Sequence, residues 1–182
     1  VLELRLNILN KYVDYFVIVE SSFTHKGDKR DLKFNHQKFK KFKDKLIYIT
    51  YDEEPPEIRK NLVNEKDDEA TKSFKYIENA ILRENGQRNH ILKGLDLAKD
   101  DDMILISDVD EIPNLENLDL SKINEKIILF KQDMFYYKFN LKLPNLDWTG
   151  TKGCRKKFLK SPQWLRNIKD RKYSFYRLDT FF

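Results

Sequence analysis

The chain has 182 residues, of which 36% are charged and 40% hydrophobic, and its formal net charge is +5. An aromatic content of 13% excludes a disordered chain, and the length predicts one globular domain. Five glycines and five prolines leave little room for linkers. The single cysteine excludes an internal disulfide and a zinc cluster of cysteines, and no apolar run approaches the length of a membrane span. The positive charge favours an anionic partner, although a lysine-rich solvated surface explains the same excess.

The predicted elements of the first half alternate between helix and strand. They are a short amphipathic helix over residues 1–10, a buried strand over 14–21, a strand over 46–51 and a long helix over 76–98. Residues 38–45 are strongly basic, and the spacing of Phe39 and Phe42 predicts a short helix with both rings in the core and the lysines in water. Contact of these lysines with an anionic surface is the alternative.

The second half predicts a short buried strand that ends near Ser107 and a strand or two over 127–140. A loop over 141–157, a short helix over 158–168 and a last strand over 173–178 follow. The order of elements resembles βαβ units and favours an α/β fold with a mostly parallel sheet. Because the chain begins at Val1, inside a predicted helix, we expect a fragment of a longer protein.

The segment from Met103 to Pro113 ends a buried strand on two carboxylates, Asp108 and Asp110. Ligands of open α/β sheets gather at the carboxyl ends of strands, and paired carboxylates suit a hard divalent cation such as Mg²⁺ or Mn²⁺. Solvation of a loop is the alternative for this common pattern. Glu111, the next acidic residue, could orient the pair or be an ordinary turn residue.

The strand over 14–21 also ends on polar residues, Glu20 and Ser21, which could bind a nucleoside or simply face solvent. Right-handed crossovers would bring the ends of this strand and of the strand before Asp108 to the same edge of one sheet. We therefore expect Glu20 and the acidic pair to border one cleft.

Three further side chains are candidates for binding a nucleoside diphosphate sugar. Arg88 could contact a diphosphate or brace the acidic pair, and His25 could contact phosphate or sugar. Trp148 could stack on a sugar ring. The alternatives are a surface arginine, a loop histidine with no other role, and a tryptophan packed against the core.

Several segments together resemble glycosyltransferase family 17, which includes β-1,4-mannosyl-glycoprotein β-1,4-N-acetylglucosaminyltransferases. The resemblance covers nearly the whole chain. Its most specific part is the occurrence of two blocks in the order found in the family, Val17–Ser21 and Asp108–Pro113. The matching segments are Leu4–Asn7, Val13–Ser21 with Thr24, His25 and Gly27, Gln87–Asn89, and Ile106–Pro113.

This resemblance implies a Rossmann-like α/β/α sandwich with a mostly parallel central sheet, spanning residues 1–182 as one catalytic domain that lacks its first strand and a C-terminal segment. It implies inverting transfer from a UDP-sugar, with Mn²⁺ or Mg²⁺ on Asp108 and Asp110, Glu20 at the nucleoside and Arg88 near the diphosphate. The implied partners are a UDP-sugar donor and a glycan or glycoconjugate acceptor, with no nucleic acid. Peripheral membrane contact stays open. The compartment follows from the source: the Golgi lumen for part of a eukaryotic enzyme, the cytoplasm for a microbial or viral one.

Competing interpretations remain. A haloacid dehalogenase-type phosphatase also places Asp-x-Asp after a strand, but on its first strand and before a threonine. A basic nucleic-acid-binding module would use residues 38–45 and leave the acidic pair without a role. A non-catalytic UDP-binding relic is the third. The catalytic base is not assigned, and Asp133 and Asp147 are its candidates.

Overall fold

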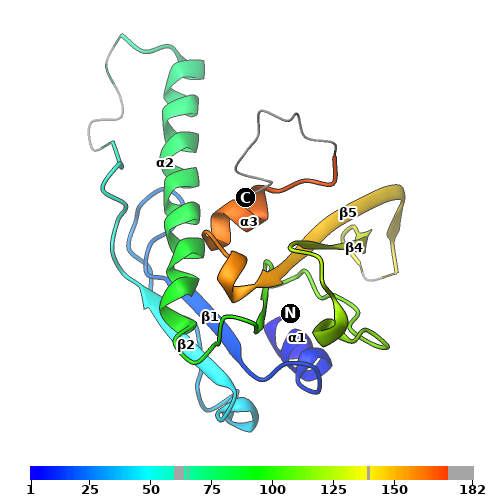
Figure 1. Ribbon diagram of the computed structural model, residues 1–182. Coiled ribbons are helices and arrows are strands. Elements are labelled where there is room, and N and C mark those ends of the chain that lie inside the picture. The colour runs from blue at the N-terminus through cyan, green and yellow to red at the C-terminus, as the bar shows by residue number, and fades with distance from the viewer. Residues whose placement is uncertain (60–63, 65, 139, 172–182) are drawn as a thin grey trace. The chain divides into compact units, whose positions relative to one another are not determined.

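The computed structural model describes residues 1–59, 64, 66–138 and 140–171 (Figure 1). These residues fall into two compact units, which we describe one at a time. Unit 1 is Val1–Val13 with Ala98–Phe182, and unit 2 is Asp14–Leu97. Among the described residues, none of the helices has both the length and the apolar character needed to cross a membrane.

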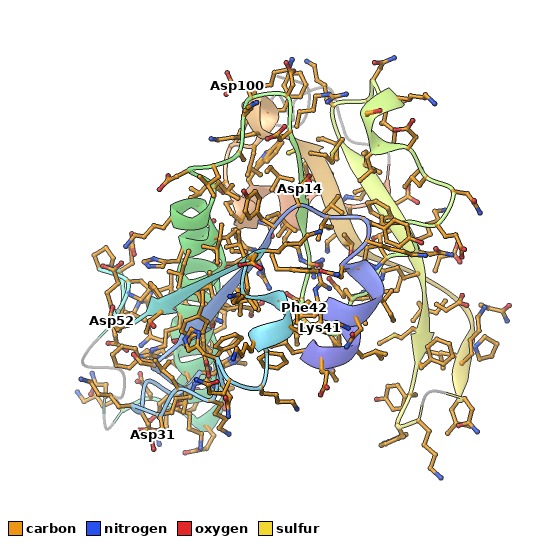
Figure 2. All side chains as sticks on the ribbon, turned by 90° about the horizontal axis from the view of Figure 1, so that it is seen from below. Asp14, Asp31, Lys41, Phe42, Asp52 and Asp100 are labelled. Carbon is orange, nitrogen blue, oxygen red and sulfur yellow. The ribbon has the colours of Figure 1, made fainter. Side chains whose placement is uncertain are left out.

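Unit 2 is a parallel strand pair covered by helices. Its elements are β1 (Phe16–Ser21), the 3₁₀ helix η1 (Lys40–Phe42), β2 (Leu46–Tyr51), α2 (Glu69–Asn89) and the 3₁₀ helix η2 (His90–Gly94). The strands pair in register from Phe16 with Leu46 to Ser21 with Tyr51. Figure 2 marks the ends of this pair, with Asp14 before β1 and Asp52 after β2. Helix α2 contacts β1, and η2 contacts both strands.

Unit 1 is built on an antiparallel sheet in the order β3-β5-β4, so the long strand β5 lies at its centre. Its elements are α1 (Leu2–Leu9), β3 (Met103–Ile106), η3 (Leu120–Lys122), β4 (Ile128–Phe135), β5 (Lys142–Arg155), η4 (Lys156–Phe158) and α3 (Pro162–Asn167). Helix α3 contacts both β5 and β3 (Figure 1).

The fold is therefore mixed α/β with two small sheets, one parallel and one antiparallel. The expectation of a mostly parallel central sheet is not confirmed, because β3 pairs with β5 in antiparallel fashion. Since β1 and β3 lie in separate sheets of the described chain, the crossover argument for one shared cleft loses its basis. The strand expected over 173–178 lies outside the described residues.

Most predicted elements are confirmed, including the short helix that buries Phe39 and Phe42. The long helix begins earlier than predicted, at Glu69, because Asp68 caps it by accepting a hydrogen bond from the Thr71 backbone N–H. Gly86 does not break this helix. A Cβ there would collide with the Tyr51 side chain, so the glycine permits a close approach.

The prediction of a loop over 141–157 is wrong, since most of this range is β5. The segment Trp148–Gly153 contains two glycines, and both lie where neighbouring side chains approach the strand. A Cβ on Gly150 would meet the Gln132 amide oxygen, and one on Gly153 would meet the Leu105 side chain. The glycines therefore allow β5 to be the central strand.

Candidate functional site: the acidic turn after strand β3

The acidic turn, residues 107–111, connects β3 to the rest of unit 1, and Arg5 of α1 holds its backbone. One Arg5 nitrogen, Nη1, donates to the carbonyl oxygens of Glu111 at 2.5 Å and Asp108 at 3.3 Å, and Nη2 donates to the Ser107 hydroxyl. Burial lowers the pKa of Arg5, and the negative charges of Glu111, Asp108 and Asp110 oppose that shift. Helix α1 thus contributes a partly buried cation that holds the turn.

The Glu111 carboxylate is the centre of the acidic turn, with 7% of its side chain exposed. Arg166 of α3 binds it with both η nitrogens, Nη1 to Oε2 at 2.8 Å and Nη2 to Oε1 at 3.0 Å. The backbone N–H of Asp108 donates to Oε2 at 2.9 Å, and the indole N–H of Trp148 donates to Oε1 at 3.0 Å. Glu111 is therefore not an ordinary turn residue, and of the two interpretations the structure favours the orienting one.

Asp108 accepts a hydrogen bond from Arg166 Nη2 at 3.0 Å, yet 45% of its side chain remains exposed. Asp110 is exposed in the same turn. Within the described part of the chain, no group of three or more His, Cys, Asp or Glu side chains is placed to hold a metal ion. The turn thus offers a cation two carboxylates, and Mg²⁺ is commonly held by one or two carboxylates together with substrate phosphates and water. The residues fit such a cation.

Trp148 lies on β5 opposite Gln132 of β4, and 42% of it is exposed. Its indole N–H donates to Glu111, so one edge of the ring is held beside the acidic turn. Gln132 accepts a hydrogen bond from the Thr151 backbone N–H at 2.8 Å, which ties the same stretch of β5 to β4. The structure therefore brings together three of the predicted residues: Asp108, Asp110 and Trp148.

The other four predicted residues belong to unit 2, and Glu20 is the most firmly held. Its carboxylate accepts hydrogen bonds from the backbone N–H groups of Lys33 at 2.8 Å and Phe34 at 3.0 Å, and from the Tyr48 hydroxyl at 2.9 Å. A carboxylate offers about four acceptor positions, so little capacity is left for a ligand. Glu20 fixes the segment after β1, and a nucleoside contact stays a prediction.

Ser21, His25 and Arg88 have local partners in unit 2. The Ser21 hydroxyl is buried and bonds both backbone groups of Phe23. His25 is exposed, and its carbonyl oxygen accepts a hydrogen bond from Arg83 at 3.0 Å. Arg88 pairs with Glu84 one turn earlier in α2 at 2.7 Å. Their roles in donor binding stay predictions.

Sequence reasoning gave no role to Arg166 or Arg83, and it used Arg5 only as part of a motif. Arg83 of α2 binds Glu54 at 2.7 Å as well as the His25 carbonyl, so it anchors the loop after β1. Gly27 in that loop has a φ of +100°, and a Cβ there would strike the Arg83 guanidinium. The Ser-Pro pair before α3 indicated the helix that carries Arg166 but not the contact itself, because that contact joins segments 55 residues apart.

Comparisons with known proteins agree with the resemblance. The chain is similar to the human and rat β-1,4-mannosyl-glycoprotein 4-β-N-acetylglucosaminyltransferases, each 27% identical over 187 residues and 99% of this chain. The mouse protein of the same name is 26% identical over the same span. The chain spans about a third of the length of these relatives, 32% in each. No solved structure matches the chain significantly. The model of glycosyltransferase family 17 matches residues 1–163, and this chain therefore belongs to that family.

Proposed function

We propose that the chain carries the donor-binding part of an N-acetylglucosaminyltransferase that uses UDP-N-acetylglucosamine and a glycan acceptor. The acidic turn is the observation that carries this proposal. It presents two solvent-accessible carboxylates, while Arg5 holds the backbone of the turn and Arg166 binds the Asp108 carboxylate. Membership of the family and the names of the relatives support glycosyl transfer.

Asp108 and Asp110 would hold a divalent cation, Mn²⁺ or Mg²⁺. Such a cation would stabilise the negative charge of the departing UDP diphosphate. Trp148 would pack one face of its ring against the C–H groups of the sugar.

The four predicted residues of unit 2 have proposed donor contacts of their own. Glu20 and Ser21 would contact the nucleoside, Arg88 the diphosphate, and His25 a phosphate or the sugar. We also propose that the chain belongs to a Rossmann-like α/β/α sandwich, as the family resemblance implies.

In the reaction, a hydroxyl oxygen of the acceptor forms a bond to the anomeric carbon of the donor sugar. The bond between that carbon and the phosphate oxygen breaks, and UDP takes the electron pair. A carboxylate accepts the proton of the hydroxyl from the face opposite UDP, which inverts the anomeric configuration. The candidates Asp133 and Asp147 face each other across β4 and β5, and each pairs with a lysine, at 2.7 Å and 3.7 Å.

A thermal shift panel of nucleotide sugars, with and without Mn²⁺, tests this proposal. We expect UDP-N-acetylglucosamine with Mn²⁺ to raise the melting temperature more than GDP-mannose or UDP-glucose does, because a ligand that binds only the folded state stabilises it. Stabilisation by an oligonucleotide that weakens steeply with salt, and none by any nucleotide sugar, would instead identify a nucleic-acid-binding module.

A further inference from the structure

The guanidinium group of Arg166 has all four of its Nη hydrogens engaged. Nη1 donates to Glu111 Oε2 and to the carbonyl oxygen of Gly150, and Nη2 donates to Glu111 Oε1 and Asp108 Oδ2. Only 11% of the side chain is exposed. The group therefore has little capacity to bind a diphosphate directly, and its contacts instead fix two carboxylates relative to each other.

The carboxylate of Glu111 is likewise engaged in hydrogen bonds through both of its oxygens. Its two oxygens accept hydrogen bonds from Arg166, from the Asp108 backbone N–H and from the Trp148 indole. The same buried carboxylate thus sets the edge of the Trp148 ring and, through Arg166, the direction of the Asp108 carboxylate.

The position of Arg166 is itself fixed by helix α3. Ser161 caps the helix by accepting a hydrogen bond from the Trp164 backbone N–H at 3.0 Å. At the other end, the buried Lys152 of β5 donates from Nζ to the carbonyl oxygens of Arg166 and Ile168. The helix is thereby attached to the central strand that also carries Trp148.

We propose that Glu111 and Arg166 are positioning residues of the donor site, which fix Asp108 and Trp148 without touching the donor. This inference rests on the proposed function of the acidic turn. The charge arrangement supports it, because Glu111 balances Arg166 and leaves Asp108 its negative charge for a cation. Without Glu111, Arg166 would be neutralised by Asp108 alone and would compete with the cation for it.

The test is an Mn²⁺ titration of the 182-residue chain. Electron paramagnetic resonance measures the concentration of free Mn²⁺ at each step. Arg166→Lys keeps the charge but removes the two-pronged contact with Glu111. We expect its dissociation constant for Mn²⁺ to rise by about tenfold or more, the range typical of lost outer contacts at metal sites. Arg155→Lys is the matched control, because Arg155 donates to the backbone carbonyls of Asp101, Ser121 and Ile123 and lies in the same unit. We expect its dissociation constant to stay within about twofold of the wild-type value.

Glu111→Gln is the second variant, which guards against poor folding of Arg166→Lys, and circular dichroism verifies the fold of each. A second readout uses Trp148 fluorescence in a Trp164→Phe background, since the chain has two tryptophans. We expect Glu111→Gln to shift the Trp148 emission and to weaken Mn²⁺ binding by about tenfold. Wild-type affinity in both Arg166→Lys and Glu111→Gln would overturn the positioning role while leaving the metal site in place. No Mn²⁺ binding by the wild-type chain would overturn the metal site itself and the inference with it.

Discussion

Glu20 and Glu111 each accept several hydrogen bonds near the end of a strand, but their donors differ. Glu111 is bound by the guanidinium of Arg166, whereas Glu20 accepts hydrogen bonds from two backbone N–H groups and the Tyr48 hydroxyl. Burial alone would raise the pKa of Glu20, but the hydrogen bonds from Lys33, Tyr48 and Phe34 outweigh it and lower the pKa below its usual value. The charged form of Glu20 therefore stabilises unit 2.

Glu20→Gln tests this contribution. Because the folded-state pKa is lowered, the stabilisation is complete above the unfolded value of 4.5 and is lost as the pH falls through the folded value. We expect the free energy of unfolding to fall by about 1.5–3 kcal/mol at neutral pH, the range for hydrogen bonds to a charged group, and the difference from wild type to shrink at a pH below 4.5.

Urea titrations at both pH values measure this difference. Glu57→Gln is the control, because Glu57 is an exposed carboxylate of the same unit. A difference between wild type and Glu20→Gln that is constant across the pH range would contradict the account.

Cys154 gives a second prediction for a single residue. It is fully buried on β5, and burial raises the pKa of its thiol to about 11. The reactive thiolate is therefore scarce at neutral pH, so we expect iodoacetamide to label the chain only after denaturation. As the only cysteine, it gives one mass increment by mass spectrometry. Rapid labelling of the folded chain would show that the thiol is accessible.

At the scale of elements, two helices begin with a side-chain cap of the same kind. Asp68 caps α2 at 2.7 Å and Ser161 caps α3 at 3.0 Å. Helix α3 carries Arg166, whereas α2 belongs to the other unit. Loss of the two caps should therefore affect stability alike but metal binding differently.

Ser161→Ala and Asp68→Ala form the corresponding matched pair. We expect each to lower stability by about 1 kcal/mol in urea unfolding, the usual cost of a lost cap. Only Ser161→Ala should weaken Mn²⁺ binding, because it loosens the helix that places Arg166. Equal Mn²⁺ affinities in the two variants would show that α3 does not influence the acidic turn.

At the scale of the whole molecule, the local elements could be predicted from the sequence because their signals are local. Continuous apolar runs indicated β1, β2 and β3, and the Ser-Pro pair indicated α3. Strand β5 was not predicted, because its glycines make room for side chains that are distant in the sequence, such as Gln132 and Leu105. The prediction of a mostly parallel sheet was not confirmed for the same reason, since β3 pairs in antiparallel fashion with a strand about 50 residues later.

The candidate site was partly predictable. Asp108 and Asp110 stand out because a buried strand ends on them, and Trp148 stands out as an aromatic residue two positions before a glycine. Arg166 and the central role of Glu111 could not be predicted, because an ion pair across 55 residues leaves no local pattern. Residues that orient others are in general less visible in a sequence than the residues they orient.

The central claim is that the acidic turn binds the donor together with a divalent cation. Isothermal titration calorimetry of UDP-N-acetylglucosamine with and without Mn²⁺ tests it on wild type and on Asp110→Ala. Asp100→Ala is the control, because Asp100 is an exposed aspartate at the opposite end of β3. We expect wild type and Asp100→Ala to bind the donor in an Mn²⁺-dependent manner, and Asp110→Ala to bind at least about tenfold more weakly. Equal donor affinity of Asp110→Ala and wild type, with and without Mn²⁺, would contradict the account.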